Sequence, residues 1–379
     1  MRSRDFIWAA LTPFIVGCDR PQGTNGPEMS AYQEPAIVSI ADTLFVVDDR
    51  NTQQHPLHNV RAAAFTTDGI AIANAGAAEI LRLDSTGALT AVYGKVGSGP
   101  GEFQALHSLW ARGDTMVAFD LTLSRLQYFV APKGYVRSQV LSREEHVLAG
   151  WLSDDLALDV DLGGAGPPPE GKSVTDTAVF RVYAPLTGVM DTVLRLPWQE
   201  RYGATLPDGG VLVLVLPLHP KGVVAARAGS IYAGTARSWQ IVRYADGASD
   251  TLTFSIPRRA LSQAILSTWQ LQQLKYSTVP RPVFRRYLES LPYPDTLPAY
   301  DKMVADESGR IWIREFAVPG AASARWIVST RNGELIGALS LSAEEAIMDV
   351  RGDSIVVLST PVEAPQTIRM YRVAIPERR

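Results

Sequence analysis

The chain has 379 residues and a formal net charge of −3, and 46% of its residues are hydrophobic. Because these values lie near those of average globular proteins, they exclude a wholly disordered or fibrous chain. The small negative charge also excludes the broad positive field that holds a nucleic-acid backbone, so no nucleic-acid partner is expected. The 30 glycines and 25 prolines favour a fold with many turns, and therefore a β-rich one.

The first 17 residues have the order of an export signal. Two arginines precede an apolar stretch from Phe6 to Gly17, which is too short to cross a bilayer as a helix. The letters IVGC that end at Cys18 resemble the lipobox of bacterial lipoproteins, in which the signal is removed before the cysteine and the thiol carries a lipid. We therefore expect residues 1–17 to be a signal peptide. Cys18 is expected to anchor the protein to a bacterial membrane, facing the periplasm or the cell surface.

Residues 18–35 are rich in Gly, Pro, Asn, Gln and Ser, which is typical of a flexible tether between a lipid and a folded domain. Residues 36–376 are then expected to form a single domain. Cys18 is the only cysteine, so neither a disulfide within the chain nor a zinc site built from cysteines is expected.

From residue 36 onward one pattern recurs, namely a turn with Gly or Asp, an alternating strand, a loop and a second alternating strand. The leading strands of six copies begin at the apolar residues Ile70, Met116, Leu156, Ile231, Ile311 and Ile355. Three of the intervals fit the blade length of a β-propeller, about 40–50 residues, and the two longer intervals need insertions. We therefore predict an all-β, six-bladed β-propeller. Seven blades are the alternative, if residues 203–217 form a blade of their own.

The segment from Val92 to Phe129, VYGKVGSGPGEFQALHSLWARGDTMVAFDLTLSRLQYF, resembles the signature of NHL-type propeller repeats, in which a G-x-G-P-G-E-F turn leads into a new blade. Together with the lipobox and the stretch PAYDKMVADESGRIWI from Pro298, it makes the chain similar to bacterial six-bladed β-propeller lipoproteins. The resemblance implies a fold and a location. It does not identify a ligand.

The glycines of the GSGPGEF turn could also be taken for a phosphate-binding loop. Such a loop needs a helix after it, whereas Glu102, Phe103 and another β repeat follow here. We therefore expect a turn between blades, in which the glycines supply positive φ and Glu102 accepts backbone N–H groups.

Two segments interrupt the β pattern. Residues 163–172 form a proline-rich loop, and between Arg258 and Pro298 apolar residues recur at helical spacing. The second segment predicts a helical insert near 259–290. From Arg258 to Arg286 it has no acidic residue and carries six basic ones, which are Arg258, Arg259, Lys275, Arg281, Arg285 and Arg286.

This local positive charge could face anionic headgroups, a glycan or a partner protein, with Arg281, Arg285 and Arg286 as candidate contacts. The alternative is a packed helix whose basic side chains simply extend into solvent.

The two ends of the repeat region each lack a partner. The sixth copy ends near Val373, one strand short of a complete blade, and a predicted pair of strands from Ile37 to Val47 precedes the first copy. Because exposed strand edges promote aggregation, propellers complete the last blade with a terminal strand. We therefore expect residues 36–48 to pair with residues 345–375.

Four of the five histidines precede the aligned strands by a similar distance, and these are His58, His107, His146 and His219. This spacing predicts that they lie where the innermost strands begin, around one mouth of the central channel. The last two blades hold Tyr300, Asp301 and Lys302, and Glu344 and Glu345, at the corresponding places.

His58, His107 and His219, with a carboxylate such as Asp301, could bind Zn²⁺ or Ca²⁺ at this mouth, as channel histidines do in some NHL-type lyases. Because no motif fixes two ligands locally, the alternative is that these histidines are solvated or cap loops.

No complete catalytic motif is present, since G-x-S-x-G is absent and the single cysteine is assigned to the lipid. We interpret the chain as a lipid-anchored cell-envelope propeller that acts as a binding or protein-interaction platform without a cofactor. An envelope protein, a peptide or a glycan is the expected partner, and the protein is expected to be monomeric. The alternative is an NHL-type metal-assisted lyase or hydrolase with Zn²⁺ or Ca²⁺ at the channel mouth.

Overall fold

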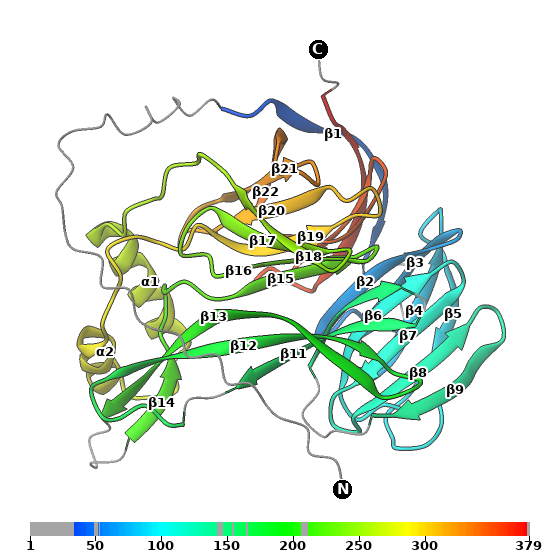
Figure 1. Ribbon diagram of the computed structural model, residues 1–379, viewed down its shortest axis with the longest axis horizontal. Coiled ribbons are helices and arrows are strands. Elements are labelled where there is room, and N and C mark those ends of the chain that lie inside the picture. Colours follow the sequence, from blue (N-terminus) through cyan, green and yellow to red (C-terminus); the bar gives the residue numbers. More distant parts are fainter. Residues whose placement is uncertain are drawn as a thin grey trace, which may run out of the picture.

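The structure is a computed structural model that describes residues 34–48, 52, 54–141, 147–153, 155–163, 166–205 and 211–376. These residues form 25 strands and two helices (Figure 1). The predicted signal peptide 1–17, Cys18, most of the tether 18–35 and His146 lie outside the described residues. What was expected of them stays a prediction.

The described strands form five sheets. The first contains β2 (Val60–Thr66), β3 (Gly69–Asn74), β4 (Glu79–Asp84) and β5 (Leu89–Tyr93). The second contains β6 (Leu106–Arg112), β7 (Thr115–Asp120), β8 (Arg125–Val130) and β9 (Gly134–Val140). The third contains β10 (Leu148–Ser153), β11 (Leu156–Gly163), β12 (Ser173–Ala184), β13 (Val189–Thr205) and β14 (Val211–Val215). The fourth contains β15 (Val223–Arg227), β16 (Ser230–Gly234), β17 (Gln240–Ala245) and β18 (Ala248–Thr253).

The fifth sheet has eight strands in the order β19-β20-β21-β22-β1-β25-β24-β23. Its bounds are β19 (Tyr300–Ala305), β20 (Ile311–Glu315), β21 (Ser323–Ser329), β22 (Leu335–Ser342), β1 (Ile37–Val47), β25 (Thr367–Ala374), β24 (Ser354–Ser359) and β23 (Glu345–Arg351). Strand β1 joins its two halves, because it pairs parallel to β22 at Ile37 and Val38 and antiparallel to β25 from Ser39 to Val47.

This pairing confirms that the N-terminal segment closes the ring. The segment is one strand of 11 residues rather than a pair of strands. Its close approach to β22 depends on Gly337, where an added Cβ would lie 2.8 Å from the Ala36 carbonyl oxygen. The Ala338 amide donates to that same carbonyl oxygen at 2.8 Å.

Tight turns connect the strands, as the Gly and Asp positions in the repeats predict. Gly113 between β6 and β7 (φ 58°) and Gly352 between β23 and β24 (φ 60°) adopt the left-handed backbone conformation that favours glycine. In the GSGPGEF turn, Glu102 accepts the Gly99 amide at 2.8 Å, and this hydrogen bond lowers the pKa of the Glu102 carboxyl. The turn therefore has the structural role predicted for it.

The strands that begin the antiparallel runs contact one another in a closed order. In the described part of the chain, β2 contacts β6, β6 contacts β10, β10 contacts β15, β15 contacts β19, β19 contacts β23, and β23 contacts β2. Apolar clusters fill the interfaces between neighbouring antiparallel runs all the way round. These features confirm the all-β, propeller class of fold.

The blade count stays a prediction, because it depends on dividing the eight-stranded sheet at the β1–β22 pair. That division gives six units and agrees with the repeats. The segment 203–217 does not form a separate sheet in the described residues, since β14 pairs with β13 inside the third sheet.

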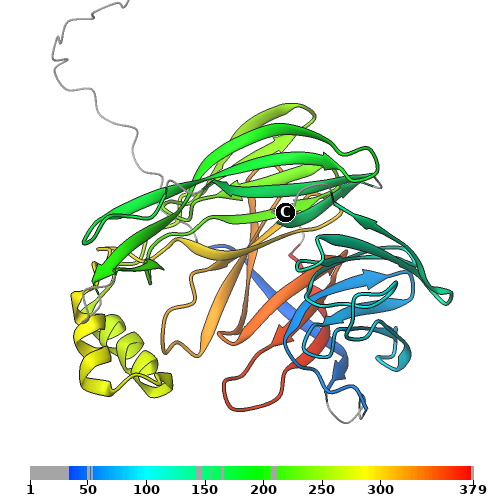
Figure 2. The same ribbon diagram turned by 90° about the horizontal axis from the view of Figure 1, so that it is seen from below.

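The predicted helical insert is confirmed as α1 (Gln263–Tyr276) and α2 (Arg281–Ser290). Helix α1 begins after Ser262, whose hydroxyl oxygen accepts the Ile265 amide, and α2 begins after Pro280. The helices bury Leu274 and Leu288 with Leu291 against Tyr202 and Leu214 of the third sheet. Figure 2 shows the yellow helices beside the green strand ends of that sheet.

We predict that deletion of residues 19–48 unfolds or aggregates the domain, whereas deletion of residues 19–35 leaves its melting temperature nearly unchanged. The longer deletion removes β1, which leaves the edges of β22 and β25 unpaired and takes Val38, Phe45 and Val47 out of two apolar clusters. Thermal melts of both purified truncations, followed by circular dichroism, measure the difference. Equal melting temperatures would contradict ring closure by β1.

Candidate functional site

Three of the predicted histidines lie where innermost strands begin, but their contacts differ. His107 lies in β6, with Nδ1 2.8 Å from the Ser108 hydroxyl and its ring edge-on to Phe119. His219 lies shortly before β15, with Nδ1 3.4 Å from a Glu200 carboxylate oxygen and Nε2 3.2 Å from the Pro292 carbonyl oxygen. His58 lies just before β2 and is exposed.

The described residues contain no group of three or more His, Cys, Asp or Glu side chains that could hold a metal ion. The metal-binding role expected for His58, His107 and His219 therefore has no support from the described residues and stays a prediction. Burial lowers the pKa of His107, and the positive charge of Arg61 lowers it further. The His107 ring is accordingly held toward its neutral form.

Tyr300, Asp301 and Lys302 begin β19 and have three different surroundings. Tyr300 is 1% exposed, and its hydroxyl donates to the Gln240 carbonyl oxygen at 2.9 Å, so it packs between sheets. Asp301 accepts from the Arg314 Nε at 2.6 Å. Lys302 is exposed, and desolvation by the surrounding protein lowers its pKa, with the neighbouring Arg314 adding to the effect. Of these three side chains, Lys302 is the most accessible to a ligand.

The insert lies on the same face as the starts of the innermost strands. Besides packing on the third sheet, α1 approaches the loop between β20 and β21, where an added Cβ on Gly320 would lie 2.8 Å from Thr268. Lys275 at the end of α1 donates to Glu363, in the loop between β24 and β25, at 2.7 Å. The insert therefore contacts three separate parts of the ring.

The three candidate basic residues of the insert all lie on α2. Arg281, Arg285 and Arg286 are exposed. No acidic residue lies between Arg281 and Arg286 in the sequence. The one acidic residue of α2, Glu289, follows them and is also exposed, so α2 keeps a net positive charge that its three arginines present to solvent.

A central cavity of ≈ 230 Å³ runs between the innermost strands. Its walls come from β2, β6, β10, β15, β19 and β23, and many of its lining residues are alanines, which are Ala62, Ala63, Ala64, Ala149, Ala225, Ala226 and Ala305. These small side chains allow the strands to approach closely. At Gly150, for example, an added Cβ would lie 2.5 Å from the Ala226 Cβ.

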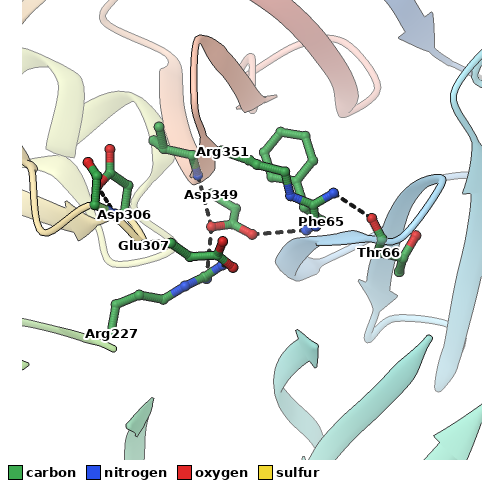
Figure 3. Close-up of polar contacts among 9 residues, drawn as sticks. Phe65, Thr66, Arg227, Asp306, Glu307, Asp349 and Arg351 are labelled. Carbon is green, nitrogen blue, oxygen red and sulfur yellow. Dashed lines mark hydrogen bonds and ion pairs between the residues drawn. The ribbon is translucent and has the colours of Figure 1, made fainter. Parts of the chain in front are cut away.

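Asp349 lies where this channel approaches the ends of the innermost strands, and it connects three sheets (Figure 3). Its carboxylate accepts the Phe65 amide of β2 at 2.9 Å and the Arg227 Nη1 of β15 at 3.0 Å. It also accepts the amide of its neighbour Val350 at 2.8 Å. Burial raises the pKa of Asp349, and the Arg227 guanidinium opposes that rise.

Two further side chains complete this arrangement (Figure 3). Arg227 Nη2 donates to Glu307 at 3.1 Å, so Arg227 joins the buried Asp349 to a carboxylate whose side chain is 65% exposed. Arg351 donates to the Thr66 carbonyl oxygen at 2.6 Å and lies over the Phe65 ring. We refer to Asp349, Arg227, Glu307 and Arg351 as the channel cluster.

The channel cluster was not predicted from the sequence, because its members come from distant repeats. One signal could have found part of it. Arg112, Arg227 and Arg351 are each the last residue of an innermost strand, immediately before a turn. Each of these arginines lies four residues before the apolar residue on which its repeat was aligned, namely Met116, Ile231 and Ile355, so that alignment already places them at one level of the ring.

The comparisons with known sequences do not identify a family for this chain. No protein-family model and no curated protein sequence matches the chain, so the resemblance to NHL repeats is not confirmed. No helix in the described ranges has the length and apolar character needed to cross a bilayer.

Similar solved structures include a protein of Bacteroides fragilis proposed to be exported, with 11% identity, a TM-score of 0.49, and coverage of 90% of this chain and 100% of that one. Another is regucalcin, a calcium-binding protein from Agrobacterium tumefaciens, with 11% identity, a TM-score of 0.40, and coverage of 90% and 97%. A third is the β-propeller domain of the Trilobed protease from Pyrococcus furiosus, with 11% identity, a TM-score of 0.40, and coverage of 84% and 81%. At these values the likeness concerns the fold alone.

We predict that Asp349→Ala lowers the free energy of unfolding by about 3 kcal/mol, because it leaves the Arg227 guanidinium and two backbone amides without their buried acceptor. Asp353→Ala is the matched control, since Asp353 lies on the same hairpin with a 62% exposed side chain. The control is expected to change stability by less than about 1 kcal/mol. Urea unfolding of both variants measures the two changes. Equal effects would show that Asp349 does not hold the sheets together.

Proposed function

We propose that the protein is exported and lipid-anchored through Cys18, and that its propeller is a platform that binds an anionic partner on the face of the helical insert. The partner is an acidic surface of an envelope protein or peptide, or an anionic glycan. The observation that carries the proposal is the position of α1 and α2, which contact three parts of the ring while α2 exposes Arg281, Arg285 and Arg286.

The physical basis is a fixed positive surface on a rigid support. Three arginines within six consecutive residues of one helix produce a field that extends about 8 Å at physiological ionic strength. Packing of Leu274 and Leu288 on the third sheet limits the loss of side-chain and backbone freedom on binding. Guanidinium groups also suit carboxylate, sulfate and phosphate partners, because they donate two parallel hydrogen bonds.

The alternative of a metal-assisted lyase or hydrolase receives no support from the described residues, where no metal-binding group of side chains occurs. A second function is therefore not proposed.

We predict that Cys18→Ser abolishes membrane attachment while leaving the propeller folded. The lipid would be carried by the Cys18 thiol, which serine cannot replace. Cell fractionation and labelling with a fatty-acid analogue provide the measurement, with the wild-type chain as the control. Unchanged labelling and an unchanged membrane fraction would disprove lipid anchoring at this residue.

We predict that reversal of Arg281, Arg285 and Arg286 to Glu reduces capture of envelope components by about tenfold at low salt. Because the attraction is electrostatic, capture by the wild-type protein should also fall as salt is raised. The variant is compared with wild type in pull-downs from envelope extracts at low and high salt, after circular dichroism has shown that it folds.

The control reverses three exposed basic residues elsewhere, which are Lys133, Arg331 and Arg372. It changes the net charge by the same amount and should bind almost as wild type does. If both triple variants lose capture equally, net charge rather than the insert is responsible. If the insert variant captures the same components as wild type, the insert has only a packing role.

A further inference from the structure

We infer that the opposite mouth of the channel, where the innermost strands end, binds a small ligand that carries a ring and a carboxylate. Trp110 and Trp151 would contact the ring, and Arg227 would bind the carboxylate in place of Glu307. This site goes beyond the proposed platform, because it lies at the other end of the channel from the insert.

The space for such a ligand is a cavity of ≈ 510 Å³ at this mouth. The residues that line it include Trp110, Arg112, Trp151, Arg227 and Glu307. A second cavity of ≈ 460 Å³ adjoins it and shares Trp110, Ala111, Arg112 and Trp151. Each volume lies within the range of about 300–1,000 Å³ that is usual for small-molecule sites.

The two tryptophans belong to neighbouring innermost strands, β6 and β10. Their ring centroids are 5.7 Å apart with an interplanar angle of 34°. Both are half-buried, and both line the two cavities. Indole groups that keep part of their surface in contact with solvent offer apolar area to a ring at a small cost in side-chain freedom. The tryptophan pair therefore favours a ligand with a flat or apolar ring face.

The charged residues that line the larger cavity favour an anion. Arg112 and Arg227 line the larger cavity, and Glu307 is the one acidic residue among the described residues that line it. Arg351 ends its innermost strand at the same level. Movement of Glu307 away from Arg227 would therefore leave Arg112 and Arg227 as the charged residues among the described residues that line this cavity.

Arg227 has two acidic partners, and it can exchange one of them, Glu307, for a ligand carboxylate. Asp349 holds one side of the guanidinium in the channel, while the other side donates to Glu307. The Glu307 side chain is 65% exposed, so its pair with Arg227 is screened by water and contributes little to stability. A ligand carboxylate could replace Glu307 without disturbing the buried half of the cluster. Glu307 is thus a competitor that a carboxylate ligand must displace.

The test is a titration of soluble protein containing residues 19–379 with two probes that share this chemistry, indole-3-acetate and D-glucuronate. Tryptamine carries the indole ring without the carboxylate and is the control probe. Calorimetry measures affinity for wild type, Glu307→Gln and Trp151→Leu. Glu344→Gln is the matched control, because Glu344 is exposed at the end of the channel where the strands begin.

We expect at least one carboxylate probe to bind, and tryptamine to bind at least about tenfold more weakly because it lacks the charge that Arg227 recognises. Glu307→Gln should tighten binding by about threefold to tenfold, since it removes the competing carboxylate. Trp151→Leu should weaken it by about tenfold. Glu344→Gln should leave the affinity unchanged.

The two carboxylate probes also distinguish which kind of ring the ligand carries. Binding of indole-3-acetate alone indicates an aromatic ligand, and binding of D-glucuronate indicates an acidic sugar. The inference is overturned if neither probe binds, if tryptamine binds as tightly as indole-3-acetate, or if Glu307→Gln behaves as Glu344→Gln does. Should Trp151→Leu fail to fold, the Glu307→Gln comparison still decides the question. Variants of the insert should not alter this binding, so the site and the platform can fail independently.

Discussion

The structure depends on one strand pairing, that of β1 with β25. Without it, the eight-stranded sheet would separate into two parts with open edges, and the contact between the last innermost strand, β23, and the first, β2, would lose its support. A central channel exists only because the innermost strands contact one another in a closed order. The hydrogen bond from the Phe65 amide to Asp349 crosses this same junction, so the channel cluster exists only in a closed ring.

Ring closure also explains how one cluster can combine a structural part with an accessible part. Asp349 is 3% exposed and satisfies groups from three strands, which requires all three to be in place. Arg227 extends from that buried point to the mouth, where its partner Glu307 is largely in water. A ligand-binding arginine must be held in position by the protein, and its partner at the surface must be able to leave. Arg227 meets both conditions, through Asp349 and Glu307 respectively.

The fold was largely predictable because each repeat is a local unit of strands and turns. Alternation and glycine positions identified the strands, a missing strand at one end identified β1 as the closing strand, and the role of Glu102 followed from the residues around it. The channel cluster was not predictable in the same way, since Phe65, Arg227 and Asp349 are brought together only by the closed ring. Spacing placed the histidines at the starts of strands but could not give the direction of their side chains, which is why His107 and His219 have unrelated partners.

The direction of β1 determines where the tether of an anchored protein would enter the fold. Strand β1 is antiparallel to β25, and Ser39 at its start pairs with Ala374 at the end of β25, so β1 begins on the side where the innermost strands end. A lipid on Cys18, as proposed, would therefore connect to the outer edge of the face whose central mouth carries Arg227 and Trp151. The insert lies at the other end of the channel. A tether of 18 residues can span up to about 60 Å when extended, which leaves room for small molecules to reach the mouth on the anchored side. Because such a tether also lets the domain turn, the arginines of α2 on the opposite face stay accessible to a larger partner.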